Sequence, residues 1–175
     1  MFRSFPLFLL VIALVFSPSA VSSADSPDNH SSASEVTVNM SRTPLRVLIE
    51  KGNFDGGHRV RATPVESIKF GKRKLWLVRP AVEFKDASAI IGYLNLIGLE
   101  PAGYRELLEL AIQKPDMLKN GEAVCAFGSP ASLQSGVVSW QCYGMKDEKR
   151  FLSDAVEGDG WNGNSYYLAK RKPTK

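Results

Sequence analysis

Two segments in the second half of the chain decide the expected fold: Glu122–Phe127 (EAVCAF) and Gly136–Tyr143 (GVVSWQCY). Both are short apolar runs of the kind that predicts strands. Each contains one of the two cysteines, Cys125 and Cys142. A disulfide needs its two Cα atoms within about 7 Å of each other, a spacing that neighbouring antiparallel strands supply. We therefore expect the two segments to form a bridged antiparallel pair.

The N-terminus predicts the compartment in which these cysteines lie. Arg3 precedes an unbroken apolar run over residues 7–16, and Ser22-Ser23-Ala24 is a small-residue cleavage pattern. Residues 1–24 therefore read as a secretory signal peptide, with an uncleaved membrane anchor as the alternative. The run is shorter than the roughly 20 apolar residues that span a bilayer. We expect a periplasmic or extracellular product, in which two cysteines predict a disulfide over a metal pair or a Cys-x-x-Cys redox site.

The remaining residues have the size of one domain. Residues 25–43 are rich in Ser, Asn, Asp and Thr and are expected to form a flexible leader. This leader carries two glycosylation-type triplets, at Asn29 and Asn39, whose use the sequence does not reveal. The domain is expected over 44–170 and a basic tail over 171–175.

Apolar runs and turn residues predict mainly strands in the first half of the domain. The expected strands cover residues 45–49, 58–62, 67–70 and 75–78, with a short edge strand at 82–85. Gly71-Lys72-Arg73 is interpreted as the hairpin turn between the third and fourth of these strands. A later helix is expected over 151–156 and a last strand over 165–170.

Helical periodicity appears in the middle of the chain. Asp86 is expected to cap a helix that ends at Gly98 and carries Ile90, Leu94 and Ile97 on one face. A second helix is expected between Pro101 and Pro115, with an apolar stripe formed by Tyr104, Leu107, Leu108 and Ala111. Together these elements predict a mainly β, α+β fold with two or three short helices.

In order and spacing, residues 59–161 resemble the staphylococcal-nuclease-like, or thermonuclease, family. The resemblance is carried by residues 67–77 (SIKFGKRKLWL), by the cysteine segments 122–125 (EAVC) and 139–142 (SWQC), and by residues 151–161 (FLSDAVEGDGW). It implies a small OB-type barrel. It also implies a disulfide between the cysteine strands, as in many exported members.

The chemistry of this family is Ca²⁺-assisted phosphodiester hydrolysis, with arginines that bind phosphate and a carboxylate that activates water. At the positions that match the family's functional residues, this chain has Glu66, Trp76, Ala81, Glu83 and Val137. Only Glu66 keeps an acidic group at a metal-ligand position, and Glu83 reaches the base position only after a one-residue shift. Trp76 and Val137 replace the two arginines. Single losses of such groups cost about 10² to 10³ in rate. The resemblance therefore implies a catalytically degenerate member without catalytic residues or a cofactor.

Three functions follow from these patterns. The leading one is binding of nucleic acid or another polyanion through Lys72, Arg73 and Lys74, with Trp76 and Trp140 as stacking faces. The same basic run is also typical of a solvated turn, and the tryptophans of a core. The formal net charge of +4 and a second basic run, Lys170-Arg171-Lys172, agree with either interpretation.

The second function is enzymatic: a remodelled Ca²⁺-dependent phosphodiesterase built from Glu66, Glu83 and Asp86. The third is a structural envelope or secreted module that binds a protein partner through an apolar patch. A histidine-based metal site or catalytic triad is disfavoured, because His30 lies in the leader and such a site would depend on His58 alone.

Overall fold

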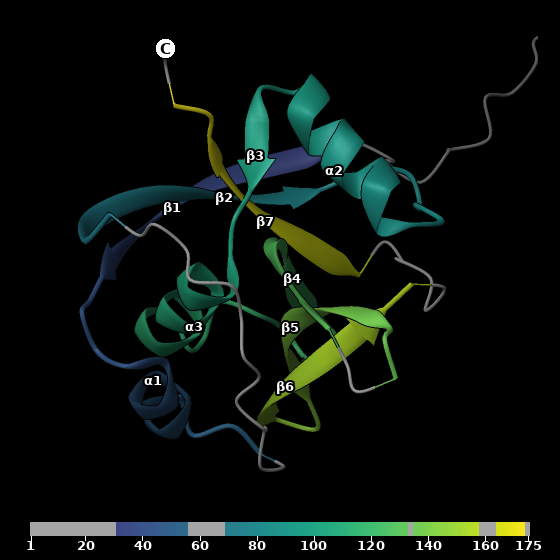
Figure 1. Cartoon of the computed structure of the whole chain (residues 1–175). Helices are drawn as coiled ribbons and strands as arrows, with labels where there is room; N and C mark the ends of the chain where they lie inside the picture. The colour runs from purple at the N-terminus through teal and green to yellow at the C-terminus, as the bar shows by residue number, and fades with distance from the viewer. Residues whose placement is uncertain (1–30, 56–68, 133–134, 158–163, 174–175) are drawn as a thin grey trace, which may run out of the picture.

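The computed structural model describes residues 31–55, 69–132, 135–157 and 164–173 as an α+β fold made mostly of strands (Figure 1). The strands are β1 (Ser32–Met40), β2 (Gly71–Arg79), β3 (Leu99–Pro101), β4 (Ala123–Ser132), β5 (Val138–Lys146), β6 (Lys149–Val156) and β7 (Ser165–Arg171). The helices are α1 (Leu45–Gly52), α2 (Ala87–Leu96) and α3 (Tyr104–Gln113). The predicted signal peptide, Glu66, His58 and the strand at 58–62 lie outside the described residues.

All the strands belong to one sheet with the order β1-β2-β7-β4-β5-β6, and β3 pairs with β7 outside this path. The pairs are antiparallel except for β4 and β7, which run parallel. Within the described part of the chain, β1 and β6 lie at opposite ends of the order and do not pair with each other. The sheet is therefore open, and the closed OB-type barrel is not confirmed.

Helices cover both faces of the sheet. Because successive strand residues point to opposite faces, β2 contributes Leu75 and Leu77 to one core and Trp76 and Val78 to the other. The first core holds α1 and α3, and the second holds α2. In Figure 1 the helices α2 and α3 accordingly lie on different sides of the strands.

Two of the three predicted helices are confirmed, as α2 and α3. The carboxylate of Asp86 accepts a hydrogen bond from the backbone N–H of Ala89 at 2.7 Å and so caps α2. In α3 the predicted stripe is buried, and Pro115 follows its C-terminal end. Pro101 lies in β3 instead of the first helical turn.

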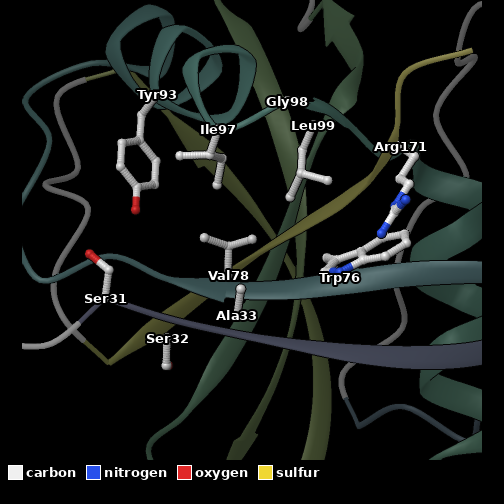
Figure 2. A pocket seen from close by; sticks show the side chains of 10 residues that line it. All are labelled: Ser31, Ser32, Ala33, Trp76, Val78, Tyr93, Ile97, Gly98, Leu99 and Arg171. Carbon is white, nitrogen blue, oxygen red and sulfur yellow. The ribbon is translucent and has the colours of Figure 1, made fainter. Parts of the chain in front are cut away.

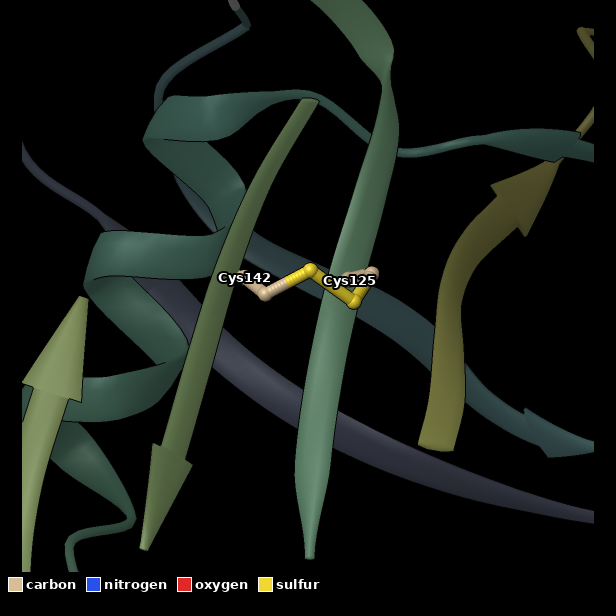
Figure 3. The surroundings of a disulfide bond; sticks show 2 residues. All are labelled: Cys125 and Cys142. Carbon is tan, nitrogen blue, oxygen red and sulfur yellow. A yellow bond between two sulfur atoms is a disulfide. The ribbon is translucent and has the colours of Figure 1, made fainter. Parts of the chain in front are cut away.

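The disulfide is also confirmed. Cys125 of β4 lies directly opposite Cys142 of β5, and the two sulfurs are 2.00 Å apart (Figure 3). The bridge is buried in the core beneath α2. It ties together two neighbouring strands near the middle of the sheet order.

Two predictions near the N-terminus are wrong. Residues 32–40, expected within the flexible leader, form β1, because Val36, Val38 and Met40 pack against the α3 core while the alternate residues face outward. Residues 45–49, expected as a strand, begin α1. There Leu45, Leu48 and Ile49 recur at helical spacing and pack against the same core.

Three further predictions are corrected. The expected turn Gly71-Lys72-Arg73 belongs to β2, where each residue pairs with β1. Residues 82–85 form no strand. Residues 151–156 form most of β6, not a helix. Asp147 and Glu148 have φ of 51° and 62° and so make a tight two-residue hairpin that pairs β6 with β5.

Candidate anion-binding groove

A highly charged cavity lies where β2 and β7 separate. The two strands pair only over Trp76–Val78 and Tyr167–Ala169. Beyond these pairs, the N-terminal half of β2 and the C-terminal end of β7 line a groove of about 690 Å³. Its lining residues are Glu35, Lys69, Lys72, Arg73, Lys74, Trp76, Glu100, Lys170, Arg171 and Pro173. Six of these side chains are cationic and two are carboxylates, so the groove is positively charged.

Carboxylates neutralise part of this charge. Lys74 pairs with Glu35 at 2.8 Å on the neighbouring strand β1. Arg73 and Lys170 both pair with Glu106 of α3, which is only 1% exposed. The same Glu106 accepts a hydrogen bond from the backbone N–H of Gly103 at 2.6 Å and caps its own helix. Arg73 and Lys170 are thereby held in place by a buried anion.

The other three cations keep their charge available. Among the described residues, Lys69, Lys72 and Arg171 have no carboxylate within ion-pair distance. Lys69 and Lys72 are exposed to solvent. Positive charges without a local partner raise the electrostatic potential of a concave surface and attract anions to it.

Trp76 is the aromatic residue of the groove. It is half-buried, and the guanidinium of Arg171 lies 5.2 Å from the centroid of its ring. Trp140, by contrast, is only 7% exposed and packs against Phe127 in the α2 core, with ring centroids 5.7 Å apart. The predicted stacking role of Trp140 is therefore wrong, because it requires an exposed ring and this ring is buried in the core.

The positions that match the nuclease family do not gather in this groove. In the described part of the chain, Ala81, Glu83 and Val137 line neither cavity that contains Trp76. The carboxylate of Asp86 is engaged in the α2 cap. No cluster of three His, Cys, Asp or Glu side chains that could hold a metal ion occurs among the residues that the structure describes.

Sequence reasoning placed Lys72, Arg73, Lys74 and Trp76 on one surface, and these residues do line one groove. It did not join them to Lys170 and Arg171, which it treated as part of a separate basic run. The register between β2 and β7 brings the two runs together, and no local pattern encodes a pairing between residues so far apart. Glu35 was missed because it lies in the segment expected to be a leader.

Comparisons with known proteins assign this chain to no family. No family model matches this chain, and no curated protein or solved structure shows a significant similarity to it. The thermonuclease resemblance therefore stays a prediction. In the described regions, no helix has the length and apolar character that crossing a membrane requires.

Proposed function

We propose that this chain acts by binding an extended polyanion along the groove between β2 and β7. The observation that supports this proposal best is the convergence of two basic segments, residues 69–74 and 170–171, on one concave surface. Three of the six cations there have no carboxylate partner in the described chain. These cations would displace the condensed counterions of a linear polyanion into the solution, and this release favours binding most strongly at low salt.

Single-stranded nucleic acid suits this groove among polyanions. Its phosphates match the row of cations, and its bases are able to stack on a tryptophan ring or an arginine plane. Trp76 with Arg171 supplies both kinds of surface at one point. A polyanion without rings, such as polyphosphate, would use the cations alone.

We also propose that binding takes place outside the cytoplasm. The signal-like N-terminus and the Cys125–Cys142 disulfide support this location. Descent from an OB-type nuclease remains a proposal that rests on the sequence resemblance. The binding proposal does not depend on it, because the groove is formed by strands that the structure describes.

Salt dependence tests the proposal. A fluorescently labelled single-stranded oligonucleotide is titrated with the oxidised chain, and its anisotropy is followed at 50 and 200 mM salt. If four cations contact phosphates, affinity should fall about 50-fold over this range. Binding that is absent at both salt concentrations, or insensitive to salt, contradicts the proposal.

A matched pair of variants locates the binding surface. Lys72→Gln removes one unpaired cation of the groove and should lower the magnitude of the salt slope by about 0.7. Lys114→Gln removes an exposed lysine outside the lining of the groove and should leave the slope unchanged. Equal effects of the two variants would show that net charge, not the groove, attracts the polyanion.

A further inference from the structure

A second cavity, here called the α2 pocket, adjoins the basic groove and has a different chemical character. It has a volume of about 500 Å³ and lies between the C-terminal part of α2 and the strands β1 and β2 (Figure 2). Its lining residues are Ser31, Ser32, Ala33, Trp76, Val78, Tyr93, Ile97, Gly98, Leu99 and Arg171. The volume falls in the range of pockets that bind small molecules.

Apolar side chains form the walls of this pocket. Figure 2 shows Tyr93 and Ile97 pointing from the α2 side toward Val78 and Ala33 of the strands. Ile97 is 43% exposed. Covering this apolar surface would be favourable for a ligand with an apolar body, at about 25 cal/mol for each Å² removed from water.

The two ends of the α2 pocket differ in polarity. Ser31 lies at the end toward which the hydroxyl of Tyr93 points, whereas Trp76 and Arg171 lie together at the other end (Figure 2). Arg171 is the one charged side chain among the lining residues that the structure describes, and it has no carboxylate partner there. A guanidinium in this position favours a carboxylate, because its parallel N–H groups match the two oxygens.

We propose that the α2 pocket binds a small amphiphile with an alkyl body and a single carboxylate, which Arg171 receives. This inference goes beyond the proposed polyanion binding, since it concerns a second ligand and a second cavity. The two cavities share Trp76 and Arg171. A bound carboxylate neutralises Arg171, so the amphiphile and the polyanion compete.

Isothermal titration calorimetry of the oxidised chain with decanoate, below its micelle concentration, tests the α2 pocket. Decanoate should bind saturably at one site per chain, and the uncharged decanol should bind about tenfold or more weakly, because it lacks the charge-assisted hydrogen bonds to Arg171. Arg171→Gln should lower the affinity for decanoate by a similar factor and leave the affinity for decanol unchanged. Absence of saturable decanoate binding overturns the inference, and so does equal affinity for decanoate and decanol.

Two neighbouring residues provide a matched control. Ile97→Glu places a charge in the α2 pocket and should reduce decanoate affinity at least about tenfold. Leu96→Glu makes the same kind of change at a side chain that is 84% exposed and lies outside the lining, and should retain binding. Equal losses of decanoate affinity in both variants overturn the assignment of the binding site to the α2 pocket. If Ile97→Glu does not fold, Ala33→Phe, which fills the pocket from an exposed position on β1, replaces it.

Failure of the α2-pocket proposal can be distinguished from failure of the polyanion proposal. Lys72→Gln should weaken oligonucleotide binding and leave decanoate binding unchanged, because Lys72 lines the groove but not the α2 pocket. Decanoate should displace the labelled oligonucleotide from the unmodified chain. If the oligonucleotide does not bind at all while decanoate does, the polyanion proposal fails and the α2 pocket stands.

Discussion

The guanidinium carbon of Arg171 lies 5.2 Å from the centroid of the Trp76 ring. Trp76 lies within β2, and Arg171 is the last residue of β7. Both residues line the α2 pocket and the basic groove, so the pair forms the common wall of the two cavities. A cation in this position over an indole contributes about 0.5 to 1 kcal/mol when the site is partly exposed.

A double-mutant cycle should detect this contact in the free energy of unfolding. The variants are Trp76→Leu, Arg171→Gln and their combination, each unfolded with urea in the oxidised state. We expect a coupling energy of about 0.5 to 1 kcal/mol, because each single variant removes the same cation–π contact. Strictly additive losses would show that the two side chains lie close without stabilising each other.

Replacement of the buried carboxylate Glu106 should destabilise the fold. Glu106→Gln keeps an acceptor for the N–H of Gly103 but removes the negative charge that Arg73 and Lys170 face. We expect a loss of about 2 to 3 kcal/mol, below the value for a fully buried pair because both cations are partly exposed. Urea unfolding of the unmodified chain and of Glu106→Gln measures this loss in the free energy of unfolding.

Glu50→Gln is the matched control for this variant. Glu50 pairs with Arg46 one helical turn away, and the two side chains are 61% and 82% exposed. Solvent screens such a pair, so the expected loss is below about 0.5 kcal/mol. Similar losses in both variants would contradict the structural role given to Glu106.

Gly128 should not tolerate a side chain. A Cβ atom at this position would lie 2.7 Å from the carbonyl oxygen of Pro101 and 2.8 Å from the backbone of Ala102. These are main-chain atoms, and the N–H of Gly128 already donates to the Ala102 oxygen at 2.8 Å. Gly128→Ala should therefore lower the free energy of unfolding by about 1 to 3 kcal/mol.

Gly92→Ala should have the opposite effect. Gly92 lies inside α2, and a Cβ atom there would meet no atom within 4 Å. Alanine in a helix interior is favoured over glycine by about 0.5 to 1 kcal/mol. Thermal unfolding of Gly128→Ala and Gly92→Ala measures both effects. A lower melting temperature for Gly92→Ala would show that the outer face of α2 is in contact with another part of the chain.

Asp86 should contribute to the pH dependence of stability. Hydrogen bonds from the hydroxyl of Ser88 and the N–H of Ala89 lower the pKa of its carboxyl from the ordinary value. The unfolded state then binds the proton at a higher pH than the folded state does. The contribution of Asp86 is full above its unfolded pKa of about 4 and is lost as the pH falls through the lower folded value.

The variant Asp86→Asn tests this dependence, because asparagine also caps helices but does not titrate. Between pH 5 and pH 3, the melting temperature of the unmodified chain should fall more than that of Asp86→Asn. Asp116→Asn is the control, since exposed Asp116 makes no hydrogen bond or ion pair within the described regions. Parallel melting curves for the unmodified chain and Asp86→Asn would contradict the assignment.

The hairpin β5–β6 shows where sequence reasoning failed. Asp147 and Glu148 both adopt positive φ, a conformation for which Asn-Gly or Asp-Gly is the usual signal. Without that signal, the sequence predicts a helix over residues 151–156. Residues 151–156 form a strand because they pair with β5, where Leu152 lies opposite Tyr143.

The amino-acid sequence by itself determined the features that depend on near neighbours. Asp86 caps α2 through the N–H three residues ahead, α3 follows from an apolar stripe, and the two cysteines face each other across adjoining strands. Such interactions form between groups that lie close along the chain or across one hairpin. The tertiary structure alone decided that the sheet stays open and that Arg171 reaches Trp76. The reason is physical: the pairing of β7 with β2 joins residues more than ninety positions apart, as in Trp76 with Ala169, and no local periodicity records it.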